Sequence, residues 1–516
     1  MAALASQLTA YLSSGERVVS FFKGSLVPKQ TISAGAAVCI SAALFLAYEQ
    51  YWYTSKKQHL PGPRWKVPVI GTFLESLNPT FEGYLSKWNS GALSCVSVFH
   101  RFIVIASTCE LSRKILLNAP QNTEPSVVDS MRKILTPENW IFLHGKAHQD
   151  YRRGLNVLFT RRALGIYAPV GGDVYSRHFQ EWLALDGKAE PYQLRFRELN
   201  MEASLRVFLG YYIPKETAQK ISTAYLRVTA ALELVNFPIA LPFTKVWYAM
   251  RAREFIVNCF IDAVKQSRVR MAEGGTPNCM LDAWIESMIE ERASGKKIRE
   301  FADKEIALVI LTFLFASQDA TTSAVTWAFQ LLADHPQVLE RIRKEQEEIR
   351  GDNLTCNLSY ELIEKMQYTR QVVMEVLRLR PPVLMIPYQT TRNWAINDDY
   401  VVPKGAMVIP TFYPALHDPE VYLNPDSFDP DRWGPEGDAH NHPKNFLVFG
   451  VGPHYCLGKE YAIMHIMGII AQASVMMDWE HIRTPKSDKI TIFATIYPQD
   501  GAIMKFRPRG SIQAST

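Results

Sequence analysis

The chain has 516 residues, of which 47% are hydrophobic and 21% are charged, the composition of a globular protein with a large core. The formal net charge of +5 is too small to indicate a nucleic-acid-binding protein, so we expect no partner of that class. The seven cysteines are scattered without a CxxC pair, which argues against a disulfide scaffold or a clustered zinc site.

An uncharged stretch near the amino terminus predicts a membrane anchor. Residues 30–48 contain no charged residue, and the 17 residues of 32–48 are mostly small or apolar, close to the shortest length that spans a bilayer. Four aromatic residues follow within 48–53, as in an interfacial belt. A cleaved signal peptide and a buried helix are the alternatives, but the stretch starts late and lacks a cleavage pattern.

This stretch divides the chain into segments with different expected roles. We assign 1–29 to an amino-terminal segment that would suit an amphipathic surface helix, 30–53 to a single transmembrane anchor, and 54–66 to a proline- and glycine-rich hinge. The catalytic domain is expected at 67–510, with a tail at 511–516. Lys and Arg number four after the stretch and three before it, so the positive-inside rule places this domain in the cytosol.

Hydrophobic patterns predict one mainly helical domain with a small β portion. Short strand-like runs occur at 96–100 and 102–106, and from about residue 124 the pattern is mainly helical. Three helices are clearest: one at Asp303–Asp334, one at about Tyr360–Arg380, and one that begins after Cys456 and runs to about Asp478. The apolar centre of the first, Ile306–Ala316, is too short to cross a bilayer and predicts a core helix.

A lone cysteine follows a glycine-rich run near the carboxyl terminus. The run is Phe449-Gly-Val-Gly-Pro-His-Tyr-Cys456-Leu-Gly458. Its glycines let the backbone turn tightly and approach a flat ligand closely. We expect the helix that follows to favour the thiolate of Cys456 through its free N–H groups and its dipole. A thiolate is the form that iron binds, although an isolated cysteine can also be a small buried hydrophobe.

Two charged groups lie in apolar surroundings. Glu375 and Arg378 are three residues apart on a helix, and the valines and leucines around them favour a buried pair over a solvated surface pair. Asp319 follows a dozen uncharged residues of the central helix, where a carboxylate is costly unless it is paired or used. A polar cluster that kinks the helix is the alternative for Asp319.

Four motifs together resemble the cytochromes P-450, over about residues 60–508. They are F-x-x-G-x-x-x-C-x-G at 449–458, E-x-x-R at 375–378, F-x-P-x-R-W at 428–433 and the propionate-binding helix at 145–153. The resemblance implies the haem-thiolate fold of that family, mainly α with a small β portion, after a single anchor. It implies haem b as cofactor, with Cys456 as the metal ligand.

The resemblance also assigns roles around the haem. The expected haem-contacting residues are Cys456, Arg152, His148, His454, Phe449, Gly450 and Gly458. The family often has Trp at position 148 and Arg at 454, but an imidazole can still donate to a propionate. A brace under the haem loop is expected from Glu375, Arg378 and Arg432. A solvated helix face is the alternative for Arg152 and its basic neighbours.

Proton delivery departs from the family pattern. In the family an acid followed by an alcohol delivers protons to bound oxygen, but Asp319 is followed by Ala320. Thr321 lies one residue further, about 100° round the helix. We therefore expect Asp319 to act with Thr321, Ser317 or water as the catalytic group.

Three segments, 314–324, 380–388 and 445–459, resemble the sterol C-22 desaturases of fungi. The resemblance implies that the protein uses O₂ and NADPH-derived electrons to introduce the C22(23) double bond of an ergostane-type sterol, late in ergosterol synthesis. It also implies the endoplasmic reticulum membrane, with membrane lipid as a neighbour. The alternatives are a haem-thiolate monooxygenase that hydroxylates or demethylates another sterol or lipid, and a sterol- or haem-binding protein without turnover.

A long, rigid, apolar sterol requires an apolar pocket. The family's substrate-contacting segments correspond here to Ile134, Trp140, Phe142, Phe237, Phe315, Ala316, Leu384, Met385, Ile386, Ala494, Thr495 and Ile496. Ordinary core packing is the alternative for each. No flavin-binding signature is present, so we expect a separate NADPH-dependent flavin reductase. Lys146, Arg153 and Lys459 are the basic residues expected to receive it.

Overall fold

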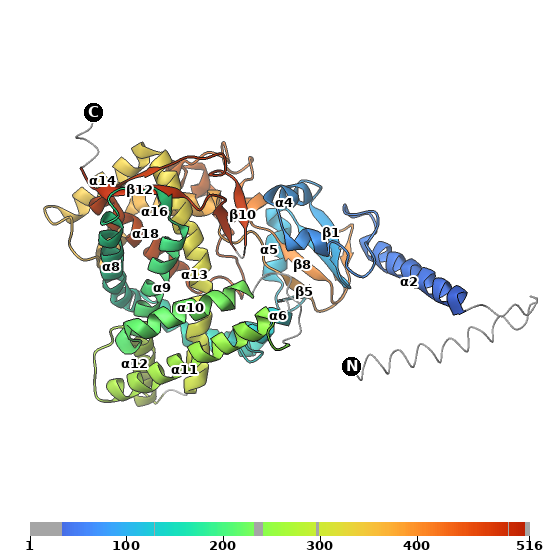
Figure 1. Ribbon diagram of the computed structural model, residues 1–516, viewed down its shortest axis with the longest axis horizontal. Coiled ribbons are helices and arrows are strands. Elements are labelled where there is room, and N and C mark those ends of the chain that lie inside the picture. The colour runs from blue at the N-terminus through green and yellow to red at the C-terminus, as the bar shows by residue number, and fades with distance from the viewer. Residues whose placement is uncertain (1–33, 128, 232–240, 296–298, 494, 511–516) are drawn as a thin grey trace, which may run out of the picture. The chain divides into compact units, whose positions relative to one another are not determined.

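The computed structural model describes residues 34–127, 129–231, 241–295, 299–493 and 495–510, so the predicted segment 1–29 lies outside the described residues (Figure 1). The chain forms two compact units, Met1–Ser55 and Lys56–Thr516. Within the described part of the predicted anchor, residues from 34 onward belong to helix α2 (Ala34–Lys57). Its side chains from 35 to 48 are exposed. That α2 spans a membrane stays a prediction, as do the segment bounds.

Helices make up most of the larger unit, which confirms the predicted mainly α class. The α-helices are α3 (Phe73–Leu77), α4 (Phe81–Trp88), α5 (Cys109–Leu117), α6 (Asp129–Ile134), α7 (Gly145–Leu155), α8 (Arg161–Leu183), α9 (Gln193–Leu209), α10 (Lys215–Ala230), α11 (Lys245–Ala272), α12 (Met280–Ala293), α13 (Asp303–Asp334), α14 (Pro336–Arg350), α15 (Tyr360–Lys365), α16 (Gln367–Leu379), α17 (Tyr413–Leu416) and α18 (Lys459–Met476). Short 3₁₀ turns are η2 (Trp140–Phe142), η3 (Asn156–Phe159), η4 (Gly210–Tyr212), η5 (Pro430–Trp433) and η6 (Asp438–Asn441).

The strands form one sheet of five strands and three smaller ones. They are β1 (Leu93–Val98), β2 (Arg101–Ala106), β3 (Thr123–Pro125), β4 (Glu190–Pro191), β5 (Tyr388–Thr390), β6 (Trp394–Ala395), β7 (Val401–Val402), β8 (Met407–Pro410), β9 (Met477–His481), β10 (Ile490–Ile492), β11 (Ile496–Pro498) and β12 (Ile503–Pro508). The large sheet has the order β1-β2-β8-β5-β3, and the others are β4-β12-β9, β10-β11 and β6-β7.

The strand-like runs predicted at 96–100 and 102–106 overlap the first hairpin of the large sheet, but β1 starts earlier, at Leu93, and Phe99 and His100 form the turn. β1 and β2 pair antiparallel, with Leu93 opposite Ala106 and Val98 opposite Arg101. β2 then pairs parallel with β8, where Ile103 faces Met407. β1 and β2, which are adjacent in sequence, thus form one edge of the sheet. β8, from the carboxyl-terminal third of the chain, is the next strand (Figure 1).

The central helix α13 has the bounds that the sequence predicts, Asp303–Asp334. Its first turn is capped because the backbone N–H of Ala302 donates to Glu305 at 2.9 Å, and Pro336 follows its end. Among the described residues it is the one helix with the length and apolar composition of a membrane span, whereas the predicted anchor begins outside them, at residue 30. However, 78% of its apolar stretch is buried inside the protein, and it packs against α9, α11, α16 and α18. It is a core helix, as predicted.

The helix predicted at about 360–380 is two helices, so that prediction is wrong in its continuity. The chain turns at Met366, between α15 and α16, where this side chain is fully buried. Glu345 of α14 caps the second helix: it accepts from the backbone N–H groups of Tyr368 at 2.5 Å and Thr369 at 3.0 Å. Because a charged acceptor satisfies the free amides, the break is stable.

The helix predicted after Cys456 begins there, but it ends slightly before the predicted limit of about Asp478. α18 begins at Lys459 and ends at Met476, and Met477 already belongs to strand β9. The interior of α18 is almost all apolar, so hydrophobicity alone gives no signal for its end. The pairing of β9 with β12, in which Trp479 faces Phe506, takes the chain out of the helix.

A buried hydrogen-bonded network connects α8, α9, α13 and α18. The amide nitrogen of Asn200 donates to the Gln318 carbonyl at 3.2 Å and to Thr322 Oγ1 at 3.1 Å. Its amide oxygen therefore accepts from His465 Nε2 at 2.5 Å. Nδ1 of His465 is then the acceptor for the Tyr175 hydroxyl, also at 2.5 Å. Burial lowers the pKa of His465 to about 3, so the imidazole is neutral, as this tautomer requires.

We expect His465→Leu to destabilise the protein by about 2–5 kcal/mol, because it leaves the buried Asn200 and Tyr175 groups without a partner. The midpoint of thermal unfolding should fall, measured on the purified protein by circular dichroism. The matched control is His442→Leu at an exposed position, which should leave the midpoint unchanged. An equal midpoint for the two variants would show that the network contributes nothing to stability.

Candidate active site

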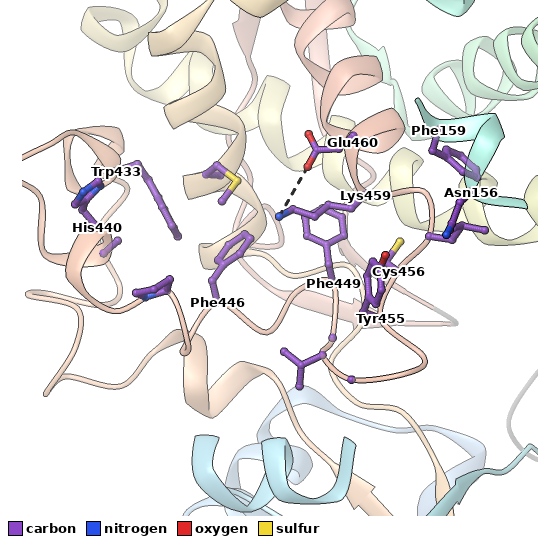
Figure 2. Close-up of a pocket in the computed structure, with 17 residues that line it drawn as sticks. Asn156, Phe159, Trp433, His440, Phe446, Phe449, Tyr455, Cys456, Lys459 and Glu460 are labelled. Carbon is purple, nitrogen blue, oxygen red and sulfur yellow. Dashed lines mark ion pairs between the residues drawn. The ribbon is translucent and has the colours of Figure 1, made fainter. Parts of the chain in front are cut away.

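The cysteine loop ahead of α18 is held in one conformation by its glycines. Gly450 and Gly452 have φ values of +66° and +79°, which disfavour any side chain. A Cβ on Gly452 would lie 2.6 Å from the carbonyl oxygen of Leu116, so the loop approaches α5 as only glycine allows. The backbone N–H of Cys456 donates to the Phe449 carbonyl at 2.8 Å and closes the loop. The thiol is thereby presented on a tight turn (Figure 2).

The electrostatics of Cys456 differ from the sequence-based expectation. Gly458 is the N-cap of α18, and its backbone N–H lowers the pKa of the thiol, as do Arg152 and Lys459. Burial is the larger effect, and it raises the pKa of Cys456 above its ordinary value. The helix terminus thus acts in the predicted direction, but burial outweighs it. A metal cation bound at Cys456 would supply the missing positive charge, because a coordinating thiol is deprotonated by the metal.

The brace predicted from Glu375, Arg378 and Arg432 is assembled in the structure. Arg378 makes a two-pronged ion pair with Glu375 at 2.8 and 2.9 Å, and Arg432 Nε donates to the same carboxylate at 3.0 Å. All three side chains are 0–2% exposed. Two partners were not predicted: Trp433 Nε1 donates to Glu375 at 3.0 Å, and Asp438 accepts from Arg432 at 2.8 Å.

The brace reaches the cysteine loop through aromatic side chains. The ring of Trp433 meets the edge of Phe446 at 4.8 Å between centroids, and Phe446 lies three residues before Phe449 of the loop. A cavity of about 950 Å³ opens beside them and has Cys456 in its wall. Several aromatic side chains line it, and Lys459 and Glu460, also in its wall, are paired at 3.9 Å (Figure 2). Phe449 and Cys456 of this lining were predicted, but Phe446 and Phe159 carried no sequence signal.

The residues predicted to bind propionates lie together. Arg152 of α7 donates to the Tyr455 carbonyl at 2.7 Å, and its guanidinium lies 4.0 Å from the centre of the Tyr455 ring. The rings of His148 and His454 stack at 4.0 Å. Burial lowers the pKa of His148 to about 4 and that of His454 to about 3, so both are neutral and each can donate one N–H.

One face of the central helix is open where a flat ligand would lie. Ala316 is exposed and Ala320 is partly exposed, although α13 is otherwise buried around them. The two alanines are four residues apart and share a face, which carries only methyl groups. Phe315 is half-buried beside them. A small-residue face on a core helix and a cysteine on a glycine-built loop fit a flat metal macrocycle.

Asp319 and Ser317 make their contacts with α9. One carboxylate oxygen of Asp319 forms an ion pair with Arg197. Ser317 Oγ lies 3.2 Å from Ser204 Oγ and donates to the Leu314 carbonyl at 3.3 Å. Burial raises the pKa of Asp319, and the Arg197 guanidinium opposes that rise. Ser317 is thus engaged with α9, and Arg197 is the neighbour of Asp319 that sequence reasoning missed.

Thr321 and the Asp319 backbone complete this region. Thr321 is buried, at 5% exposure, on the turn that contains Asp319. The carbonyl of Asp319 accepts from Thr495 Oγ1 at 3.3 Å and from the Tyr497 hydroxyl at 3.1 Å. The backbone of α13 is therefore fixed at Asp319 by the segment that ends in β11.

The predicted sterol contacts fall into four groups. Phe237 and Ala494 lie outside the described residues. Buried residues are Ile134, Trp140, Leu384, Thr495 and Ile496. Phe142, Met385 and Ile386 are partly buried, like Phe315, whereas Ala316 is exposed. Among the basic residues expected at a reductase site, Lys146 is exposed and Arg153 forms a surface pair with Asp150 at 3.3 Å. These roles stay predictions.

The residues 61–502 match the family Cytochrome P450, and the chain belongs to this family. Membership implies a haem iron with a thiolate ligand, and it confirms the predicted fold. The cyanobacterial CYP120A1 bound to retinoic acid has the same fold, with a TM-score of 0.75 over 87% of this chain and 100% of that one. At 24% identity this likeness is one of fold alone.

Among its relatives are fungal C-22 sterol desaturases. The chain is 49% identical to that of Aspergillus fumigatus over 89% of its own length and 92% of the relative. It is 48% identical to an enzyme of this name from Gibberella zeae, over 90% of each chain. The Saccharomyces cerevisiae enzyme is 46% identical over 91% of this chain and 89% of the relative.

We expect Glu375→Gln to destabilise the protein by about 3–5 kcal/mol, because it leaves two buried guanidinium groups facing one neutral amide. The thermal midpoint and the amount of bound haem should both fall. Glu364→Gln is the matched control, since Glu364 pairs with Arg161 at the surface, and it should change neither quantity. Equal behaviour of the two variants would contradict the structural role of the brace.

Proposed function

We propose that the protein is a haem-thiolate oxidoreductase that introduces the C22(23) double bond into the side chain of an ergostane-type sterol, late in ergosterol biosynthesis. The observation that carries the proposal is the identity of 46–49% with fungal C-22 sterol desaturases over about nine-tenths of the chain. In the overall reaction the sterol loses two hydrogens, and O₂ takes these, two electrons from NADPH and two protons to form two molecules of water.

The chain's own residues have separate tasks in this reaction. Bound haem with a thiolate ligand supplies the O₂ chemistry that removes hydrogen from an unactivated carbon. Cys456 would provide the thiolate, and the glycine turn holds it in place. His148, Arg152 and His454 would donate to the two propionates. The alanine face of α13 leaves space for the reacting carbons above the ring.

Desaturation differs from hydroxylation in what must be held in place. Two neighbouring hydrogens have to lie near the reacting centre, which is a problem of orientation more than of reactivity. Rigid apolar side chains suit this task, because a sterol offers shape and little polarity. The residues that support such a pocket are the buried Ile134, Leu384 and Ile496 and the half-buried Phe315.

The remaining partners follow from the same proposal. Electrons come from NADPH through a separate flavin reductase, and the exposed Lys146 and Arg153 are candidates for its binding surface. The apolar surface of α2 supports a single-pass anchor in the endoplasmic reticulum membrane, with the larger unit in the cytosol.

Reconstitution with a flavin reductase, NADPH and an ergostane-type sterol saturated at C22 tests the function. We expect a product two mass units lighter, with the new double bond at C22, identified by mass spectrometry and NMR. An alcohol or a product lacking a methyl group as the sole outcome would replace the proposal by a hydroxylase or demethylase. If sterol does not increase the rate of NADPH consumption, the protein binds sterol or haem without turnover.

We expect Cys456→Ser to abolish desaturation, because an alcohol is a poor ligand for haem iron. The absorption spectrum of the reduced protein with carbon monoxide should lose its thiolate-type band. Cys356→Ser is the control, a partly exposed cysteine far along the chain from the loop, and it should keep both activity and band. Full turnover in Cys456→Ser would contradict the assignment of this ligand.

A further inference from the structure

Arg197 connects the buried acid of the central helix to two other helices. It lies in the first turns of α9 and forms its ion pair with Asp319 of α13, where the side chains are 17% and 7% exposed. Its other terminal nitrogen donates to Thr229 Oγ1 at 3.1 Å, in the last turn of α10. The Arg197 guanidinium thus connects α9 to Thr229 of α10 and to Asp319, the acidic residue in the middle of α13.

Three buried polar atoms at this junction have no partner among the described residues. They are Asp319 Oδ2, Gln318 Oε1 and the Tyr225 hydroxyl. Tyr225 lies on α10 with its ring 5.9 Å from the Arg197 guanidinium, and the charge of Asp319 adds to the burial that raises its pKa. Buried polar atoms are nearly always hydrogen-bonded, and a water with two to four such neighbours is the ordinary solution. The junction therefore has the polar groups that a buried water needs.

The other groups near Asp319 are already engaged or absent. Position 320 is an alanine, and Ser317 is bonded to Ser204. The Tyr497 hydroxyl, on the side of β11, donates to the Asp319 carbonyl at 3.1 Å, which leaves its proton committed. The ionisable groups that face Asp319 are thus Arg197 from α9, Tyr225 from α10 and Tyr497 from β11.

We propose that Arg197 is a positioning residue that holds the Asp319 carboxylate at the α9–α10 junction, so that protons reach the acid from this junction through water beside Tyr225 and Thr229. Asp319 passes a proton towards the open alanine face of α13 and takes another from the junction, so its own charge is restored in each cycle. The route takes the place of the alcohol that is missing at 320. The use of these protons rests on the proposed function.

The variants separate the charge of Arg197 from its place in the fold. Arg197→Gln removes the positive charge. Arg197→Lys keeps the charge but lacks the second guanidinium nitrogen, which donates to Thr229. Arg195→Gln is the matched control, two residues away on α9 in a partly exposed pair with Glu190. Each holoenzyme is first checked for haem content and thermal midpoint, and the comparison uses variants that match the parent protein in both.

The first measurement follows the Asp319 carboxyl by infrared spectroscopy as pH is varied, with Asp319→Asn to assign its band. Arg197 favours the charged form, so its loss should keep the carboxyl protonated up to a pH about 1 or more units higher. Arg197→Lys and Arg195→Gln should titrate close to the parent. An unchanged titration in Arg197→Gln would overturn the proposal, and this measurement needs no turnover.

The second measurement compares two oxidants. With NADPH, reductase and O₂, Arg197→Gln should form sterol product at least tenfold more slowly, with a larger solvent deuterium isotope effect, whereas Arg197→Lys and Arg195→Gln stay within about threefold. An organic hydroperoxide needs no protons delivered to O₂, so it should restore the rate of Arg197→Gln. An equal loss with both oxidants would overturn the proposal in favour of a structural role. A parent protein that desaturates no sterol would refute the proposed function alone.

Discussion

A single buried carboxylate organises the region around the reactive cysteine. Glu375 accepts five hydrogen bonds: two from Arg378 and one each from Arg432, Trp433 and the backbone of Asp429. Burying such charges costs several kcal/mol per ion unless they are fully paired. The set is balanced, because Glu375 and Asp438 face Arg378 and Arg432, so no net charge is left inside. Only one arrangement satisfies all donors, and this fixes the segment that precedes the cysteine loop.

The central helix presents two chemically different faces. Ala316 and Ala320 leave an open apolar face, whereas Ser317 and Asp319 make polar contacts with α9. The 100° step between successive residues separates the two sets on one turn. The substrate can therefore lie on one side of α13 while Asp319 lies on another. Asp319 is held by Arg197 and is buried, which raises its pKa.

The sequence predicted the parts of the fold that depend on local patterns. α13 lies where periodicity places it, β2 lies within one residue of its predicted run, and the family of the chain follows from motifs of fixed spacing. Prediction failed where the local structure depends on residues that are distant in sequence. The break at Met366 depends on Glu345 of another helix, and the partner of Asp319 is 122 residues away in sequence. The effect of the helix terminus on the Cys456 thiol follows from its place in the sequence, but the burial that outweighs this effect cannot be read from neighbouring residues.

The parallel pairing of β2 with β8 bears on how the chain assembles. Ile103 lies opposite Met407, so more than 300 residues separate two neighbours in one sheet. During synthesis, β2 has an open edge until the segment around 407 has emerged, and an unpaired strand edge is a site for wrong association. Closing so large a loop costs entropy that many helical contacts must offset first. The helices built between these strands thus act as the scaffold on which the sheet is finished, and a chain that stops short of β8 would keep its edge exposed.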